Sequence, residues 1–82
     1  MLDKHKTFCD EINCDGVSYR FISSHLLNSK KLITQLIDSK TGIDVPLSNY
    51  TLIRKNMNNI IIEFKDPPFK GEQYYLLVLK VD

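Results

Sequence analysis

The chain has 82 residues, a mass of 9.5 kDa and a formal net charge of +1 from 11 basic and 10 acidic residues. A chain this short buries only about 60% of its extended surface on folding, so it forms one small domain and a two-lobed enzyme is excluded. The balanced charge creates no long-range field, and we therefore expect neither nucleic acid nor a membrane as a partner.

The apolar runs are far shorter than the roughly 20 residues that cross a bilayer, and residues 1–7 are polar, so we expect neither a transmembrane helix nor a signal peptide. Cys9 and Cys14 are too few for a disulfide scaffold, and with His5 and His25 they complete no metal-ligand spacing. We therefore expect two reduced thiols, no bound metal and no cofactor.

The first half of the chain predicts short strands. It lacks alanine and is rich in β-branched and aromatic residues, which favour a pleated surface. Alternation indicates a strand over residues 17–24, and the Asp15-Gly16 turn before it predicts a hairpin with a strand over residues 7–12. A further strand is expected over residues 32–37, ended by a turn at residues 38–42.

The second half follows the same pattern. Residues 43–47 extend the preceding hairpin briefly, because Pro46 marks an edge or a bulge, and residues 50–55 form the next strand. An asparagine-rich loop then leads to a strand over residues 59–65, in which Ile60, Ile62 and Phe64 face the core. The two prolines within residues 66–71 predict a loop.

The last strand, over residues 72–81, contains an unbroken apolar run at residues 74–79. One face of such a strand packs into a core and the other needs a partner surface, which predicts oligomerisation. We assign Tyr74, Leu76 and Val78 to the core. The opposite parity forms the expected interface: Tyr75, Leu77 and Leu79.

These elements predict an all-β fold, a single antiparallel β-sandwich of immunoglobulin-like size with six or seven short strands. The sandwich spans residues 1–82, with residues 1–6 as an N-terminal extension.

No constellation of catalytic residues is recognisable. The three glycines are far apart, so the chain has no phosphate-binding loop, and His25 has no identifiable acidic partner although it follows Ser23 and Ser24. Asp10, Glu11 and Asp15 are better explained as a solvated hairpin rim, and the scattered lysines as edge protection. We therefore expect a protein that is not an enzyme.

The succession of elements resembles a small β-sandwich module of tail-fibre, neck-appendage and other virion proteins of tailed bacteriophages. The elements that carry this resemblance are Asp15-Gly16 with Tyr19 and Phe21, residues 25–29 after the first hairpin, the strand and turn of residues 32–42, residues 60–64, Pro67-Pro68 with Gly71, and residues 74–79. They cover most of the chain. Leu26 departs from the pattern, because such modules often carry asparagine there, and the turn after His25 should be held by different hydrogen bonds.

The resemblance implies a structural or accessory virion protein, attached to the capsid surface, a head fibre or the tail. Its expected partners are other virion proteins and further copies of itself, with a trimer favoured because the modules usually belong to trimeric fibres. It implies no catalytic residues, and the expected location is the virion after synthesis in the host cytoplasm.

Two alternatives belong to other functional classes. One is a receptor-binding module that recognises a host glycan through loop residues Asn49, Tyr50 and Phe69, because exposed aromatic rings stack on sugars. The other is a small inhibitor of a host protein, which the size of the chain permits.

Overall fold

The computed structural model describes residues 6–81, and the expected N-terminal extension lies, apart from Lys6, outside these residues. The described residues form strands and one short 3-10 helix, which confirms the all-β prediction. The strands are β1 (Thr7–Asn13), β2 (Arg20–Ser24), β3 (Leu32–Asp38), β4 (Tyr50–Arg54), β5 (Asn59–Phe64) and β6 (Gln73–Lys80), and the helix is η1 (Leu47–Asn49). Within residues 6–81, no helix has the length and apolar character needed to span a membrane.

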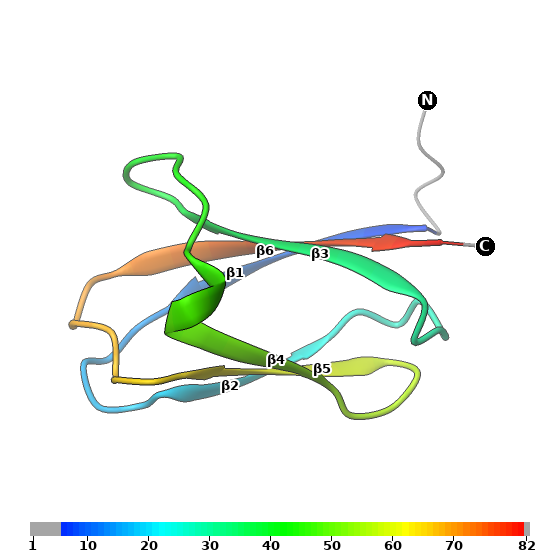
Figure 1. Ribbon diagram of the computed structural model, residues 1–82, viewed down its shortest axis with the longest axis horizontal. Coiled ribbons are helices and arrows are strands. Elements are labelled where there is room, and N and C mark those ends of the chain that lie inside the picture. Colours follow the sequence, from blue (N-terminus) through cyan, green and yellow to red (C-terminus); the bar gives the residue numbers. More distant parts are fainter. Residues whose placement is uncertain (1–5, 82) are drawn as a thin grey trace.

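The strands form two antiparallel three-stranded sheets, in the orders β1-β6-β3 and β2-β5-β4. The sheets lie in two layers (Figure 1). Both central strands, β5 and β6, are the segments with the highest apolar content in the sequence. A central strand loses water on both edges to its neighbours, so apolar side chains are favoured there.

The core lies between the two layers and is built from alternate residues of the central strands. Ile60, Ile62 and Phe64 of β5 are buried, and Leu76 and Val78 of β6 are buried opposite them, as the alternation predicts. Tyr74 is partly buried and packs on this cluster, with its ring centroid 5.3 Å from that of Phe64. Each fully buried Leu or Ile contributes about 1.5–3 kcal/mol relative to exposure, so these positions dominate the stability of the fold.

The predicted hairpin between the first two strands is wrong. β1 pairs with β6 and β2 pairs with β5, so the Asp15-Gly16 turn carries the chain from one sheet to the other. The Asp15 carboxylate accepts hydrogen bonds from the backbone N–H groups of Ser18 and Val17 and from the Ser18 hydroxyl, which lower the pKa of Asp15 to about 2. Residues 17–19 consequently form a loop instead of the start of a strand.

Hydrogen bonds join the two sheets along both open sides, between β1 and β2 on one side and between β3 and β4 on the other. On one side the Ser23 hydroxyl donates to the Asp10 carboxylate at 2.6 Å, and on the other the Arg54 guanidinium donates to the Leu32 carbonyl at 3.0 Å. The Val45 N–H also donates to the Leu36 carbonyl at 2.9 Å, which covers part of the β3 edge. Inward-pointing charges and covering loops are devices that hinder the addition of further strands at an edge.

Substitution of Gly16 tests whether the turn between the sheets requires a residue without a side chain. Its φ is +84°, and a Cβ there would lie 3.1 Å from the Lys70 backbone nitrogen, whereas at Gly42, with φ +72°, a Cβ would meet open space. Both Gly→Ala changes incur the left-handed penalty of about 1–2 kcal/mol, and Gly16→Ala adds a backbone clash. We expect Gly16→Ala to lower the free energy of unfolding in urea by at least about 1 kcal/mol more than Gly42→Ala. Equal losses would contradict this close approach.

Substitution of Leu26 tests the backbone conformation of the loop after β2. Leu26 is exposed and has φ +57°, in the left-handed region that asparagine tolerates better than leucine. The position therefore suits the asparagine that the resembling modules often carry. We expect Leu26→Asn to raise the free energy of unfolding by about 0.5–1 kcal/mol. Leu27→Asn, at the adjacent buried position, should instead lower it by about 2 kcal/mol or more; a stability loss for Leu26→Asn would contradict the prediction.

Candidate interaction surface

The outer side of the β1-β6-β3 sheet presents three rows of side chains away from the core. Successive residues of a strand point to opposite faces, so the register of the strands determines which residues share this side. We call this set the nine-residue face. Its rows are Thr7, Leu79 and Ile33; Cys9, Leu77 and Gln35; and Glu11, Tyr75 and Ile37.

The three residues predicted as the interface all lie in the middle of this face, on β6. Leu77 and Leu79 are half-buried between their neighbours on β1 and β3, and Tyr75 is 37% exposed. The adjacent Ile33 is 59% exposed, so the apolar surface continues onto β3. The outward parity of the three residues agrees with the prediction, and their role as an interface remains a prediction.

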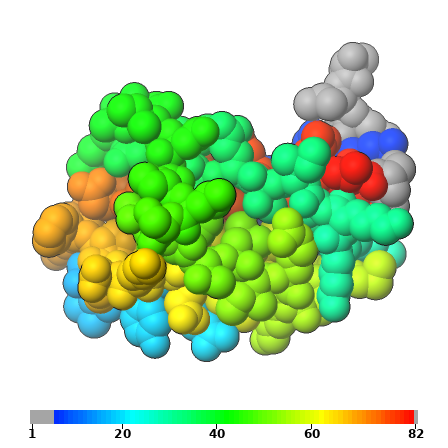
Figure 2. Space-filling view, in the orientation of Figure 1, coloured from blue at the N-terminus to red at the C-terminus, as the bar shows by residue number. Residues whose placement is uncertain are grey.

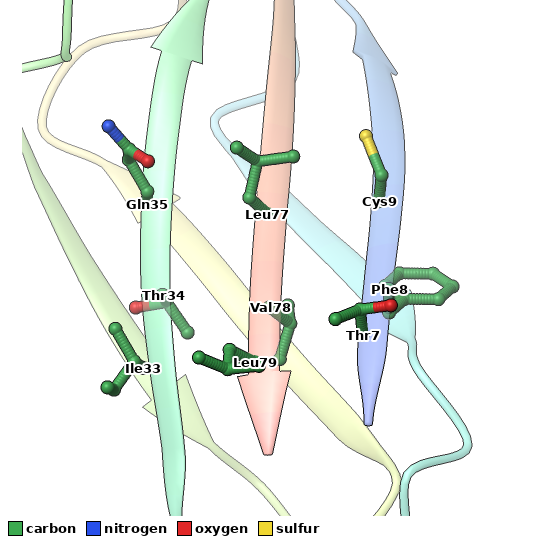
Figure 3. Close-up of a pocket in the computed structure, with 9 residues that line it drawn as sticks. All are labelled: Thr7, Phe8, Cys9, Ile33, Thr34, Gln35, Leu77, Val78 and Leu79. Carbon is green, nitrogen blue, oxygen red and sulfur yellow. The ribbon is translucent and has the colours of Figure 1, made fainter. Parts of the chain in front are cut away.

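One half of the face is hollow. A shallow pocket of about 420 Å³ is lined by residues 7–9 of β1, 33–35 of β3 and 77–79 of β6, among them the outward Ile33, Leu77 and Leu79 (Figure 3). Cys9 and Thr7 form its border on β1. Figure 2 shows the same side in outline, hollowed between the green segment of residues 39–46 and the red end of β6. An apolar hollow open to solvent suits an inserted apolar or aromatic side chain better than a charged ligand.

Opposite charges lie at the two ends of the face. Lys31 is exposed two residues before Ile33, beyond the hollow end. Glu11 lies in the third row, and Asp44 lies beside Ile37 and accepts a hydrogen bond from the Gln35 amide at 2.8 Å. Within residues 6–81 the ion pairs are Arg20–Glu63 at 3.8 Å and Lys40–Glu72 at 4.0 Å, so Lys31, Glu11 and Asp44 are not charge-paired.

The predicted ligand-loop residues do not form one recognition surface. Asn49 is exposed and lines a hollow of about 240 Å³ with Lys65 and Asp66. Tyr50 is buried, with its ring 6.2 Å from that of Phe64, and burial raises the pKa of its hydroxyl. Phe69 is 81% exposed but does not line that hollow. A sugar could therefore not stack on Tyr50 in this structure.

The structure pairs Ser23 with Asp10, and His25 follows two residues after Ser23; the Ser23–Asp10 contact of this cluster is not visible in the sequence. Ser23 donates to Asp10, whereas the Nδ1 atom of His25 accepts from the Leu27 N–H at 3.0 Å. Ser23 and His25 are buried, and the Nε2 atom of His25 has no hydrogen-bond partner. A catalytic triad requires the serine hydroxyl to donate to the imidazole and to be open to substrate. This cluster meets neither condition and is better explained as part of the packing between sheets.

The two thiols occupy different environments. Both cysteines are free; Cys9 is exposed on the nine-residue face, whereas Cys14 is buried. Burial, with the nearby charge of Glu72, raises the pKa of the Cys14 thiol. In the part of the chain that the structure describes, no three His, Cys, Asp or Glu side chains are grouped so as to hold a metal ion.

Most of this face was missed by sequence reasoning, which identified the three β6 residues alone. Ile33, Cys9 and Gln35 join them because β6 pairs with both β1 and β3. The alternation within each strand indicated which residues share a side of that strand. It did not indicate which strands pair with one another. Comparison of the chain with family models, curated proteins and solved structures finds no match.

His25 yields a prediction of pH dependence. Burial lowers the pKa of the imidazole below the ordinary 6.5, and protonation of Nδ1 would remove the acceptor of the Leu27 N–H. The unfolded chain therefore binds the proton more readily, so stability is full above pH about 6.5 and falls as the pH drops below it.

We expect urea midpoints to decrease from pH 7.5 to pH 5.5 in the native protein and to decrease less in His25→Asn, whose side-chain oxygen can accept the same N–H without titrating. Parallel pH profiles for the two proteins would exclude His25 as the cause.

Proposed function

We propose that the protein is a non-enzymatic assembly module, a small β-sandwich that binds other protein subunits and copies of itself through the nine-residue face. The observation that carries this proposal is the partly exposed apolar surface of β6 and β3, centred on Leu77. Contiguous apolar surface on a folded domain commonly marks a protein contact.

The open sides of the sandwich are less suited to assembly than this face. Asp10 points inward on the edge strand β1, Arg54 does so on β4, and residues 43–45 cover part of the β3 edge. β2 and β4 are only five residues long. A partner strand added at these edges would pair with a short strand, or with one whose edge carries a charged residue or is covered by a loop. A partner on the face would cover apolar side chains.

We further propose that the assembly is a bacteriophage virion, in which the protein is a structural or accessory component of the capsid surface, a head fibre or the tail. The resemblance of the sequence to virion β-sandwich modules supports this role. The left-handed conformation at Leu26 agrees with the asparagine that those modules often carry. Glycan binding has weaker support because Tyr50 is buried, and no residue specifically favours inhibition of a host protein.

The contact face is tested by Leu77→Asp. A carboxylate at its centre would be desolvated in any face-to-face contact, so we expect the variant to remain folded and to weaken self-association by about tenfold or more. Thr51→Asp is the matched control, because Thr51 is exposed on β4 of the other sheet. Light scattering over a concentration series measures both; an oligomer unchanged by Leu77→Asp would reject this face.

The virion assignment is tested separately on purified particles. We expect mass spectrometry to detect the native chain in particles and to show reduced incorporation of Leu77→Asp relative to Thr51→Asp. Absence of the native chain from particles, with capture by a host protein, would replace the virion role by that of an inhibitor.

A further inference from the structure

The nine-residue face is complementary to itself when a second copy is turned end for end. Its hollow lies around the first two rows, and Tyr75, which is 37% exposed, lies in the third row of the same central strand. In this end-for-end twofold stack, centred on Leu77 with the axis across the strands, each first row faces the partner's third row. The ring of Tyr75 from each copy then faces the hollow of the other, which at about 420 Å³ has room for it.

Two twofold arrangements can bring these faces together, and the charges distinguish them. With the axis along the strands, β3 lies over the partner's β1 and Asp44 approaches Glu11 of the other copy. With the axis across the strands, β3 lies over the partner's β3 and Asp44 approaches Lys31. The first arrangement places like charges together and the second places opposite charges together, so the second is favoured.

We propose that a second copy of this chain covers the nine-residue face, with its strands antiparallel to those of the first and Tyr75 inserted in each hollow. This inference rests on the proposed self-association and specifies its geometry. It replaces the trimer expected from the resemblance by a symmetric pair, because both halves of the contact are supplied by one surface.

The size of the face sets the strength of this pair. Three strands about 4.8 Å apart and seven residues long, at about 3.4 Å per residue, give a footprint on the order of 350 Å². A standard stable interface covers about 800 Å² per partner. The pair is therefore weak and concentration-dependent in solution, and forms readily where an assembly holds copies close together.

Cys9 provides a direct test, because it lies in the central row and is the exposed thiol of the native chain. In the proposed arrangement Cys9 faces Cys9 of the second copy, and position 35 faces position 35. We expect a short bismaleimide to link native chains into a covalent dimer whose yield falls on dilution. Cys9→Ser should not be linked, and Cys9→Ser with Gln35→Cys should be linked again.

Variants of Tyr75 and of the charged residues Lys31 and Asp44 complete the test. By sedimentation, Tyr75→Ala should weaken the pair by about tenfold, whereas Tyr75→Phe should retain it. Lys31→Glu should weaken it by about threefold, and Lys31→Glu with Asp44→Lys should restore it.

The possible failures separate this geometry from the proposed function. If neither the native protein nor Cys9→Ser with Gln35→Cys is linked by itself but a mixture of the two is, the twofold axis runs along the strands; the present geometry is then wrong, while self-association stands. If native protein stays monomeric at the highest concentration, the pair is wrong, and incorporation of the chain into particles then decides the assembly role alone.

Discussion

The two-sided apolar character of β6 is the constraint on which the rest of the structure depends. β6 is the central strand of its sheet, so its neighbours cover both backbone edges and only its two faces remain to be buried. Leu76 and Val78 complete the core with β5, and they are almost fully removed from water. The alternate residues, centred on Leu77, gain partial cover from β1 and β3 alone. One strand thus stabilises the domain with one parity and leaves a partly exposed apolar surface with the other.

Polar groups at the sheet edges hinder the addition of further strands there. A small sheet with open edges tends to extend by adding strands, which leads to unlimited assembly. Here the Asp10–Ser23 and Arg54–Leu32 bonds place polar groups at the open sides while they also join the two sheets. Partly buried charge-assisted bonds of this kind contribute modest net stability. They also hinder the addition of a further strand at these sides, so in the proposed assembly the outer face makes the contact.

Local sequence patterns predicted the strands well and their partners less well. The alternation of Ile60, Ile62 and Phe64 identified both the strand and its core-facing side, because alternation is a property of a single segment; Ile61, on the other side, is buried as well. The Asp15-Gly16 turn was assigned to a hairpin, but the same turn chemistry serves a connection between sheets. Pairing of β6 with both β1 and β3 depends on contacts distant in sequence. The candidate surface followed from that pairing, so a single strand revealed three of its nine residues.

Weak association is consistent with a role in assembly. Tyr75 and Ile33 are exposed in the single chain, yet the small area of the face limits the affinity of a free pair. A monomer that stays dispersed after synthesis and associates once copies are held together avoids premature aggregation. The opposite charges of Lys31 and Asp44 then contribute orientation more than affinity, because exposed ion pairs are each worth only about 0–1 kcal/mol. In the proposed pair, apolar burial along β6 supplies the strength of the contact, and the charged ends of the face set its orientation.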